Sequence, residues 1–241
     1  SPERDYQDEV PNEDSYLLEF DEGNLFSLNR FSGWDARESG LRANLGLGWT
    51  RIDPAGWSIG LTAGRVLRSK PDRNFADHSP VGGKSSDWLL AAHYSGSNGL
   101  AIANRALFDD SFSISRNELR LGWYQPWLQV SAGYLWLDSD LREDRLEDVS
   151  ELTTLAGWQI ADGWWASAET RYDFTDNRAQ KAELGLQYRN ECITVEMSVE
   201  RRFTSSVELN AETSFDLGIR LGGFDQQKAG PGTVARRACL R

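Results

Sequence analysis

The sequence predicts an all-β chain that folds as an antiparallel transmembrane β-barrel. Apolar and polar residues alternate along most of the 241 residues, whereas helical periodicity is hard to find. The alternating segments are roughly ten residues long, near the length that crosses a bilayer at a tilt. Short and longer connections also alternate, as in outer-membrane barrels with short turns at one rim and longer loops at the other.

Strands are expected wherever the alternation is clear. The first runs from Leu41 to Trp49, with Leu45 and Leu47 on an apolar face and glycines on the other. The same pattern recurs in the ranges 57–64, 118–123, 129–134, 182–188, 193–200 and 215–222. Together with the segments between them, these ranges predict about eleven to twelve strands.

The connections between the strands fall into two groups. Short turns are expected at 53–56, 95–98, 125–126, 161–163 and 189–191. Longer polar links are expected near 69–85, 109–111, 138–148, 175–178 and 204–210. Because the two groups alternate along the chain, every second connection returns to the same side of the membrane.

Tryptophan placement favours the same structure. Indole rings prefer the membrane interface, where the ring is buried and the N–H remains hydrated. Six tryptophans flank the predicted short turns: Trp49, Trp57, Trp123, Trp127, Trp158 and Trp164. They predict an aromatic girdle at this rim, with a second girdle toward the opposite strand ends.

A soluble β-sandwich is the alternative fold, since its strands alternate as well. Sandwich strands are usually shorter, about 5 to 6 residues. The polar face here is also rich in Gly, Ser and Thr and carries charges such as Arg120 and Glu183, which suits a wet lumen.

Composition excludes several function classes. The formal net charge of −11 leaves no basic cluster for binding nucleic acid. The mean hydropathy of −0.55 argues against a helical membrane span. His78 and His93 are the only histidines and lie in different contexts, so neither a metal site nor a catalytic triad is predicted, and no cofactor is expected.

Two segments resemble a known family. One is Asn24-Leu25-Phe26 followed by Arg30-Phe31-Ser32-Gly33-Trp34-Asp35-Ala36-Arg37, and the other is Tyr188-Arg189-Asn190-Glu191-Cys192 followed by Arg201 to Ser206. They resemble the C-terminal barrel domain of the lipopolysaccharide-assembly outer-membrane protein LptD, over roughly residues 12 to 225. The residues that carry the first motif are Asn24, Leu25, Phe26, Arg30, Phe31, Gly33, Asp35 and Arg37.

This resemblance implies a domain organisation. Residues 15–224 would form the C-terminal part of the barrel, after a polar lead-in at 1–14 and before a disordered tail at 225–241. The N-terminal periplasmic domain and the remaining strands would lie outside this chain. The irregular, aromatic and Arg-containing make-up of the segment from Asn24 to Arg37 predicts a loop that contacts a plug or folds into the lumen.

Cys192 is the residue singled out for chemistry. In the family, a cysteine in this region forms a disulfide with the N-terminal domain, often as part of an adjacent pair. Here Ile193 follows Cys192, so the pair is absent, and the only other cysteine is Cys239. A disulfide with an absent domain, a Cys192–Cys239 bridge and a free thiol all remain open.

The function that the resemblance implies is transport without catalysis. The barrel would insert lipopolysaccharide into the outer leaflet of a Gram-negative outer membrane through a lateral gate. Its partners would be the lipoprotein LptE, which plugs the lumen, and the periplasmic Lpt bridge proteins. A passive porin-like channel is the alternative, and a barrel enzyme is disfavoured because only two histidines are present.

Overall fold

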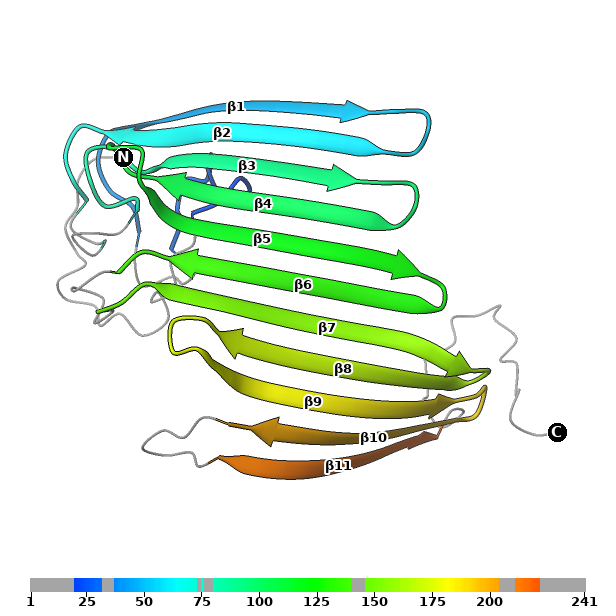
Figure 1. The fold of residues 1–241 in the computed structure, drawn as a ribbon. Helices are drawn as coiled ribbons and strands as arrows, with labels where there is room; N and C mark the ends of the chain where they lie inside the picture. Colours follow the sequence, from blue (N-terminus) through cyan, green and yellow to red (C-terminus); the bar gives the residue numbers. More distant parts are fainter. Residues whose placement is uncertain are drawn as a thin grey trace, which may run out of the picture. The chain divides into compact units, whose positions relative to one another are not determined.

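The protein is described by a computed structural model that covers residues 20–31, 37–72, 75, 80–139, 146–203 and 211–221. These residues contain eleven strands in one antiparallel sheet, each hydrogen-bonded to its neighbour in the sequence (Figure 1). The strands are β1 Arg42–Ile52, β2 Ser58–Arg68, β3 Trp88–Ser95, β4 Leu100–Phe108, β5 Ile114–Gln125, β6 Leu128–Leu137, β7 Val149–Ala161, β8 Trp164–Asp173, β9 Arg178–Arg189, β10 Ile193–Arg202 and β11 Glu212–Leu221. The predicted all-β class and strand number are confirmed.

The described ranges contain no helix, and therefore no helix there that is long and apolar enough to cross a membrane. The chain divides into two compact units. Unit 1 comprises residues 1–121 and 133–150, and unit 2 comprises residues 122–132 and 151–241.

In unit 1, register places the alternating residues on two distinct faces. Across β1 and β2, Leu47 pairs with Ala63 and Trp49 pairs with Leu61, whereas Gly46 pairs with Gly64. Leu47 and Trp49 expose 76% and 51% of their surface. We call the side with Leu47 the apolar face and the side with Gly46 the polar face.

Unit 2 repeats this arrangement. Met197 of β10 pairs with Leu217 of β11 on the apolar face, and Ser198 pairs with Asp216 on the polar face. Leu217 is 67% exposed. In both units the exposed apolar side chains therefore gather on one side of a single-layered sheet, as a membrane-facing wall requires.

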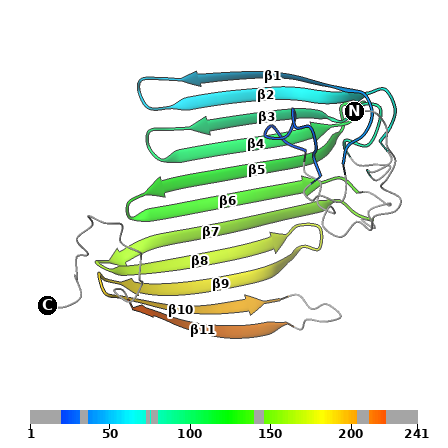
Figure 2. The ribbon, with the colours of Figure 1, turned by 180° about the vertical axis from the view of Figure 1, so that it is seen from behind.

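The connections alternate in length as predicted, and Figure 2 shows the two groups at opposite strand ends. Three short turns place a glycine at positive φ, namely Gly56, Gly99 and Gly163. This conformation costs glycine little because it has no Cβ. In the turn between β9 and β10, Asn190 instead accepts hydrogen bonds from two backbone N–H groups, those of Cys192 and Ile193.

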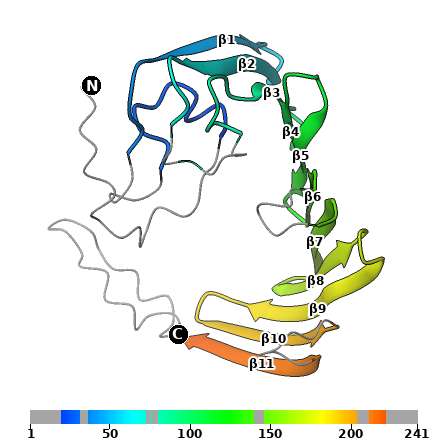
Figure 3. The ribbon, with the colours of Figure 1, turned by 90° about the vertical axis from the view of Figure 1, so that its left-hand side faces the viewer.

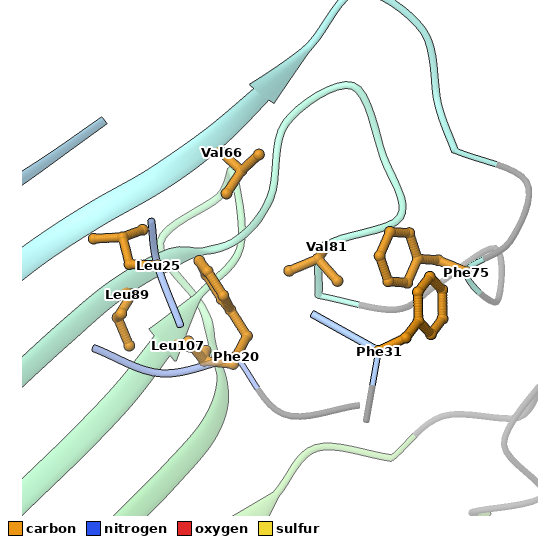
Figure 4. Close-up of a cluster of buried hydrophobic side chains, with 8 residues drawn as sticks. All are labelled: Phe20, Leu25, Phe31, Val66, Phe75, Val81, Leu89 and Leu107. Atoms are coloured by element: carbon orange, nitrogen blue, oxygen red, sulfur yellow. The ribbon is translucent and has the colours of Figure 1, made fainter. Parts of the chain in front are cut away.

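A hydrophobic core lies on the polar face of unit 1. Its members are Phe20, Leu25, Phe31, Val66, Phe75, Val81, Leu89 and Leu107 (Figure 4). They come from the segment before β1, from β2, β3 and β4, and from the connection between β2 and β3. Figure 3 shows the segment before β1, in dark blue, beneath β1 and β2.

Candidate functional site

The segment of residues 20–31, here called the covering segment, begins with a tight turn. The backbone N–H of Asp21 donates to Asn24 Oδ1 at 3.0 Å, and the backbone N–H of Asn24 donates to Asp21 Oδ1 at 2.8 Å. Short Asx side chains stabilise turns in this way by replacing backbone partners. The turn brings the next residue, Leu25, against the sheet.

Leu25 is fully buried in a socket on the polar face. A Cβ added to Gly46 would lie 2.6 Å from Leu25 Cδ2, and a Cβ added to Gly64 would lie 2.4 Å from the same atom. Two paired glycines on adjacent strands therefore create the space that the leucine fills. Any larger residue at either position would displace the leucine from the sheet.

Three strand residues whose side chains point inward, to the polar face, complete the surface on which Leu25 packs. We call this surface the seat. Leu89 of β3 pairs with Leu107 of β4, and both are 1% exposed. Val66 of β2 is fully buried beside them. These inward apolar residues depart from the polar pattern of this face, and burying them under the covering segment removes their surface from water.

A buried ion cluster fixes the end of the covering segment. Arg30 Nη1 donates to both carboxylate oxygens of Glu38, at 2.8 and 2.9 Å, and Arg30 Nη2 donates to the carbonyl of Leu25. Arg68 of β2 donates to Glu38 Oε2 at 2.6 Å, and Arg42 Nη1 lies 3.7 Å from the same atom. The side chains of Arg30 and Glu38 are 0% exposed.

One carboxylate therefore serves three guanidinium groups in a water-poor environment. Burial lowers the pKa of Arg30, and the charge of Glu38 opposes that shift. A buried charge is tolerated only when it is paired and hydrogen-bonded. The cluster accordingly fastens the covering segment to β1 and β2 through contacts that cannot be exchanged for water without cost.

A second ionic contact fastens the other end of the covering segment. Arg105 of β4 donates to both carboxylate oxygens of Glu22, at 2.8 and 3.1 Å, and Arg105 Nη1 lies 3.4 Å from Glu118 of β5. The hydrogen bonds from Arg105 hold the pKa of Glu22 below its usual range. Glu22 is partly exposed, so this contact contributes less than the buried cluster.

The apolar face of unit 1 also carries a charged contact, at the ends of β2 and β3 that lie beside the longer connections. The Arg65 guanidinium lies 4.7 Å from the ring centroid of Trp88 and 2.7 Å from Asp110. This contact lowers the pKa of the Asp110 carboxyl. Arg–Trp stacking next to apolar strand surface is typical of a membrane interface.

Unit 2 presents a groove on its polar face instead of a core. The groove has a volume of about 440 Å³, and all of its lining residues belong to strands β8 to β11. They are Ser167, Glu183, Gly185, Leu186, Gln187, Glu196, Met197, Ser198, Asp216, Leu217 and Gly218. Hydroxyl, amide and carboxylate groups line it, and these can hydrogen-bond to a hydrated or sugar-like ligand.

Residues with small side chains form the floor of this groove. Ser167 pairs with Gly185, and Gly185 pairs with Ser198, so three small residues lie side by side on three strands. Longer side chains stand beside them, with Gln187 donating to Glu196 at 2.7 Å. The depression therefore follows from side-chain size along one row of the sheet.

The neighbouring row of unit 2 is acidic. Lys181 lies 3.4, 2.9 and 3.2 Å from Glu169, Glu183 and Glu200. A single ammonium group therefore bridges carboxylates from three adjacent strands. Without it, like charges paired directly across strands, such as Glu169 and Glu183, would repel each other.

Comparison with known proteins gives the family. The family model described as "LptD: LPS transport system D" matches residues 1–164 of the 241. The chain belongs to the LptD family. The resemblance expected from the two sequence motifs is therefore confirmed.

Several proteins named LPS-assembly protein LptD are similar to this chain. The one from Haemophilus influenzae strain 86-028NP is 28% identical over 210 residues, which is 80% of this chain and 26% of the relative. The one from Vibrio cholerae El Tor Inaba N16961 is 25% identical over 79% of this chain, and the one from Escherichia coli K12 is 24% identical over 83%. The chain spans about a quarter of the length of these LptD relatives.

The LptD-like motif lies largely within the covering segment. Five of its residues are described there: Asn24, Leu25, Phe26, Arg30 and Phe31. Phe31 stacks on Phe75 with ring centroids 4.5 Å apart, whereas Phe26 is 62% exposed. Arg37 is exposed just before β1, and Gly33 and Asp35 lie outside the described residues.

Sequence reasoning missed Glu38 and the inward apolar seat. The signal for the seat was present in the sequence, because alternation fails at Val66-Leu67, Leu89-Leu90 and Leu107-Phe108. Two successive apolar residues in a strand place one on each face. Three such breaks in consecutive strands would have predicted that something covers the polar face there.

The six tryptophans predicted to form an aromatic girdle lie in or beside strands. Trp49, Trp123, Trp127, Trp158 and Trp164 are between 38% and 54% exposed, and Trp57 is half-buried under Arg51. All six lie at or next to the short-turn ends of strands. Their membership of an interfacial girdle stays a prediction.

Cys192 lies in the short turn that immediately precedes β10 and is half-buried. Its predicted disulfide, whether with another domain or with Cys239, stays a prediction. Within the described ranges no group of three His, Cys, Asp or Glu side chains is arranged to hold a metal ion. His93 lies on the polar face over Gly60, and His78 lies outside the described residues.

Proposed function

We propose that this chain forms part of the wall of an LptD-type β-barrel that assembles lipopolysaccharide in the outer membrane of a Gram-negative bacterium. The observation that carries the proposal is the match of the LptD family model to residues 1–164. The proposed role is transport and assembly, without catalysis. The relatives' printed name, LPS-assembly protein, supports this role.

The two faces of the sheet suit this role. Leucines, tryptophans and phenylalanines such as Leu47, Trp123 and Phe215 are 43% to 80% exposed on or beside the apolar face, which would contact acyl chains of the bilayer. The polar face would line the lumen. A strand wall of this kind satisfies its backbone hydrogen bonds within the sheet, as the membrane interior demands.

The groove of unit 2 is the proposed contact for the hydrophilic part of lipopolysaccharide. Its serine, glutamine and carboxylate groups accept hydrogen bonds from sugar hydroxyls. Acyl chains cannot follow a polar route at low cost and would leave sideways through a lateral gate. We assign one side of that gate to β11, which in the described residues pairs with β10 alone.

The proposed partners lie outside this chain. They are the lipoprotein LptE as a lumen plug and the periplasmic Lpt bridge proteins, which would reach the barrel through an N-terminal domain. Cys192, in the short turn before β10, would be joined to that domain by a disulfide. The tryptophans near the short turns would hold this rim at the membrane interface.

Depletion of the full-length protein in its own host tests the proposal. Surface lipopolysaccharide, measured with an antibody on intact cells, should fall as the protein is lost and return when the wild-type protein is supplied. Purified protein in a planar bilayer should show no steady ion conductance. Normal surface lipopolysaccharide after depletion, together with steady conductance, would establish the porin-like channel instead.

A further inference from the structure

The proposed transport role does not by itself explain the covering segment and its seat. A polar lumen wall needs small or hydrophilic inward residues, yet Val66, Leu89 and Leu107 point inward and are buried. These residues create a need for a permanent apolar cover. The chain supplies that cover from its own residues 20–31, whose contacts include Leu25, Phe20 and Phe31.

We propose that the covering segment is a stationary seal, which closes the part of the lumen bordered by β1 to β4 against hydrophilic solutes and stays seated while lipopolysaccharide passes. The proposal adds a barrier function to the transport function. It rests on the proposed outer-membrane location, because a seal has a role only where the polar face lines a pore.

Contacts at three points argue that the segment stays in place. Leu25 occupies the Gly46–Gly64 socket, Arg30 is joined to the fully buried Glu38, and Glu22 is held by Arg105. Withdrawal would expose the apolar seat to water and remove the two hydrogen bonds that Arg30 donates to the buried carboxylate of Glu38. Such contacts on different strands must all break together for the segment to move.

The connection between β2 and β3 strengthens the cover from the other side. Phe75 stacks on Phe31, and the Arg68 guanidinium lies 5.1 Å from the Phe75 ring. Val81 is fully buried in the same cluster, and its carbonyl accepts a hydrogen bond from Arg68. The cover therefore consists of two stretches of chain packed on each other and on the sheet, which is the construction expected of a fixed part.

A leak experiment tests the sealing function in cells whose only copy of the full-length protein carries Leu25→Ala. Truncating a fully buried leucine weakens its seat, so sensitivity to the large hydrophilic antibiotic vancomycin should rise by about tenfold. Surface lipopolysaccharide, measured in the same cells, should remain at the wild-type level. Leu28→Ala is the matched control, because Leu28 is on the same segment but 87% exposed, and it should change neither measurement.

Two results of this experiment would overturn the seal. One is unchanged vancomycin sensitivity in Leu25→Ala with the folded protein present at normal amounts. The other is a rise in sensitivity that occurs only with a matching loss of surface lipopolysaccharide, because a disturbed leaflet would then explain the leak. Loss of surface lipopolysaccharide on depletion of the whole protein is a separate result and bears on the transport proposal alone.

A cysteine lock tests whether the segment stays seated. Leu25→Cys combined with Gly64→Cys places two thiols where the leucine side chain meets the socket. Under oxidising conditions, the locked protein should support surface display of lipopolysaccharide within about twofold of the same double variant kept under reducing conditions. Loss of display on oxidation, restored by a reductant and absent from the Leu25→Cys variant alone, would show that the segment must move and would refute a stationary seal.

Discussion

The polar faces of the two units are built differently, although both come from the same alternating sequence pattern. All buried hydrophobic side chains among the described residues belong to unit 1, and so do the buried charges of Arg30, Glu38 and Arg68. The polar face of unit 2 carries a groove of about 440 Å³ lined only by strand residues.

The difference shows how inward residues decide the use of a barrel wall. Where they are apolar, as at Leu89 and Leu107, the wall requires a cover, and the chain before β1 provides it. Where they are small and polar, as at Ser167 and Ser198, the wall stays open to a hydrated ligand. The polar face of unit 1 supplies rigidity, and the polar face of unit 2 supplies a surface for contact.

The largest effect is expected from Glu38→Gln, which leaves three guanidinium groups around a neutral side chain. Breaking a buried ion pair costs about 3–5 kcal/mol of stability. The fraction of heat-modifiable, folded protein in outer membranes should fall steeply in semi-native gels with added urea. Glu196→Gln is the matched control, because its Arg220 partner is 76% exposed, and its cost should be below about 1 kcal/mol. Equal costs for the two variants would erase the contrast between the units.

A smaller, functional effect is expected from filling the groove. Ser198→Trp places a large side chain on the floor of the 440 Å³ groove, which should lower surface lipopolysaccharide by roughly two- to tenfold at an unchanged amount of folded protein. Val199→Trp adds the same side chain to the opposite face of β10, where Val199 pairs with Phe215. That control should leave display at the wild-type level. Normal display in the Ser198 variant would remove the groove from the transport route.

The smallest effect concerns pH and the Glu22–Arg105 contact. A carboxyl whose pKa is lowered by folding stabilises the folded contact above its unfolded pKa of about 4.3, and that stabilisation is lost as the pH falls through the lower folded value. Hydrogen exchange of residues 20–31, corrected for intrinsic rates, should therefore lose protection between pH 5 and pH 3. We expect a loss below about fivefold, because exposed ion pairs contribute little.

Glu22→Gln provides the control for this pH effect. Its residues 20–31 should show the same corrected protection at pH 5 and pH 3. A pH-dependent loss in Glu22→Gln equal to that of the wild type would assign the titration to another group. Protection that stays constant in the wild type would show that Glu22 contributes nothing to seating the segment.

Much of the fold could be read from the sequence because strand alternation is a local property. A residue in a strand alternates sides whatever the rest of the chain does, so the apolar residues 45, 47 and 49 and the polar positions between them predicted β1 correctly. The short turns were equally local, since Gly56 and Gly163 at positive φ lie within four-residue stretches. The motif residues Leu25 and Arg30 were identified by their resemblance to an LptD-family segment, which is also a local feature of the sequence.

The covering segment could be placed only by the tertiary structure. Leu25 meets Gly64 across 39 positions of sequence, and Arg30 meets Arg68 through Glu38, so no local pattern records these contacts. The sequence by itself determined the strands, their faces and the membership of a family. The tertiary structure decided which part of the polar face is covered and which stays open, because burial of apolar and charged groups depends on residues that meet only when distant strands pair.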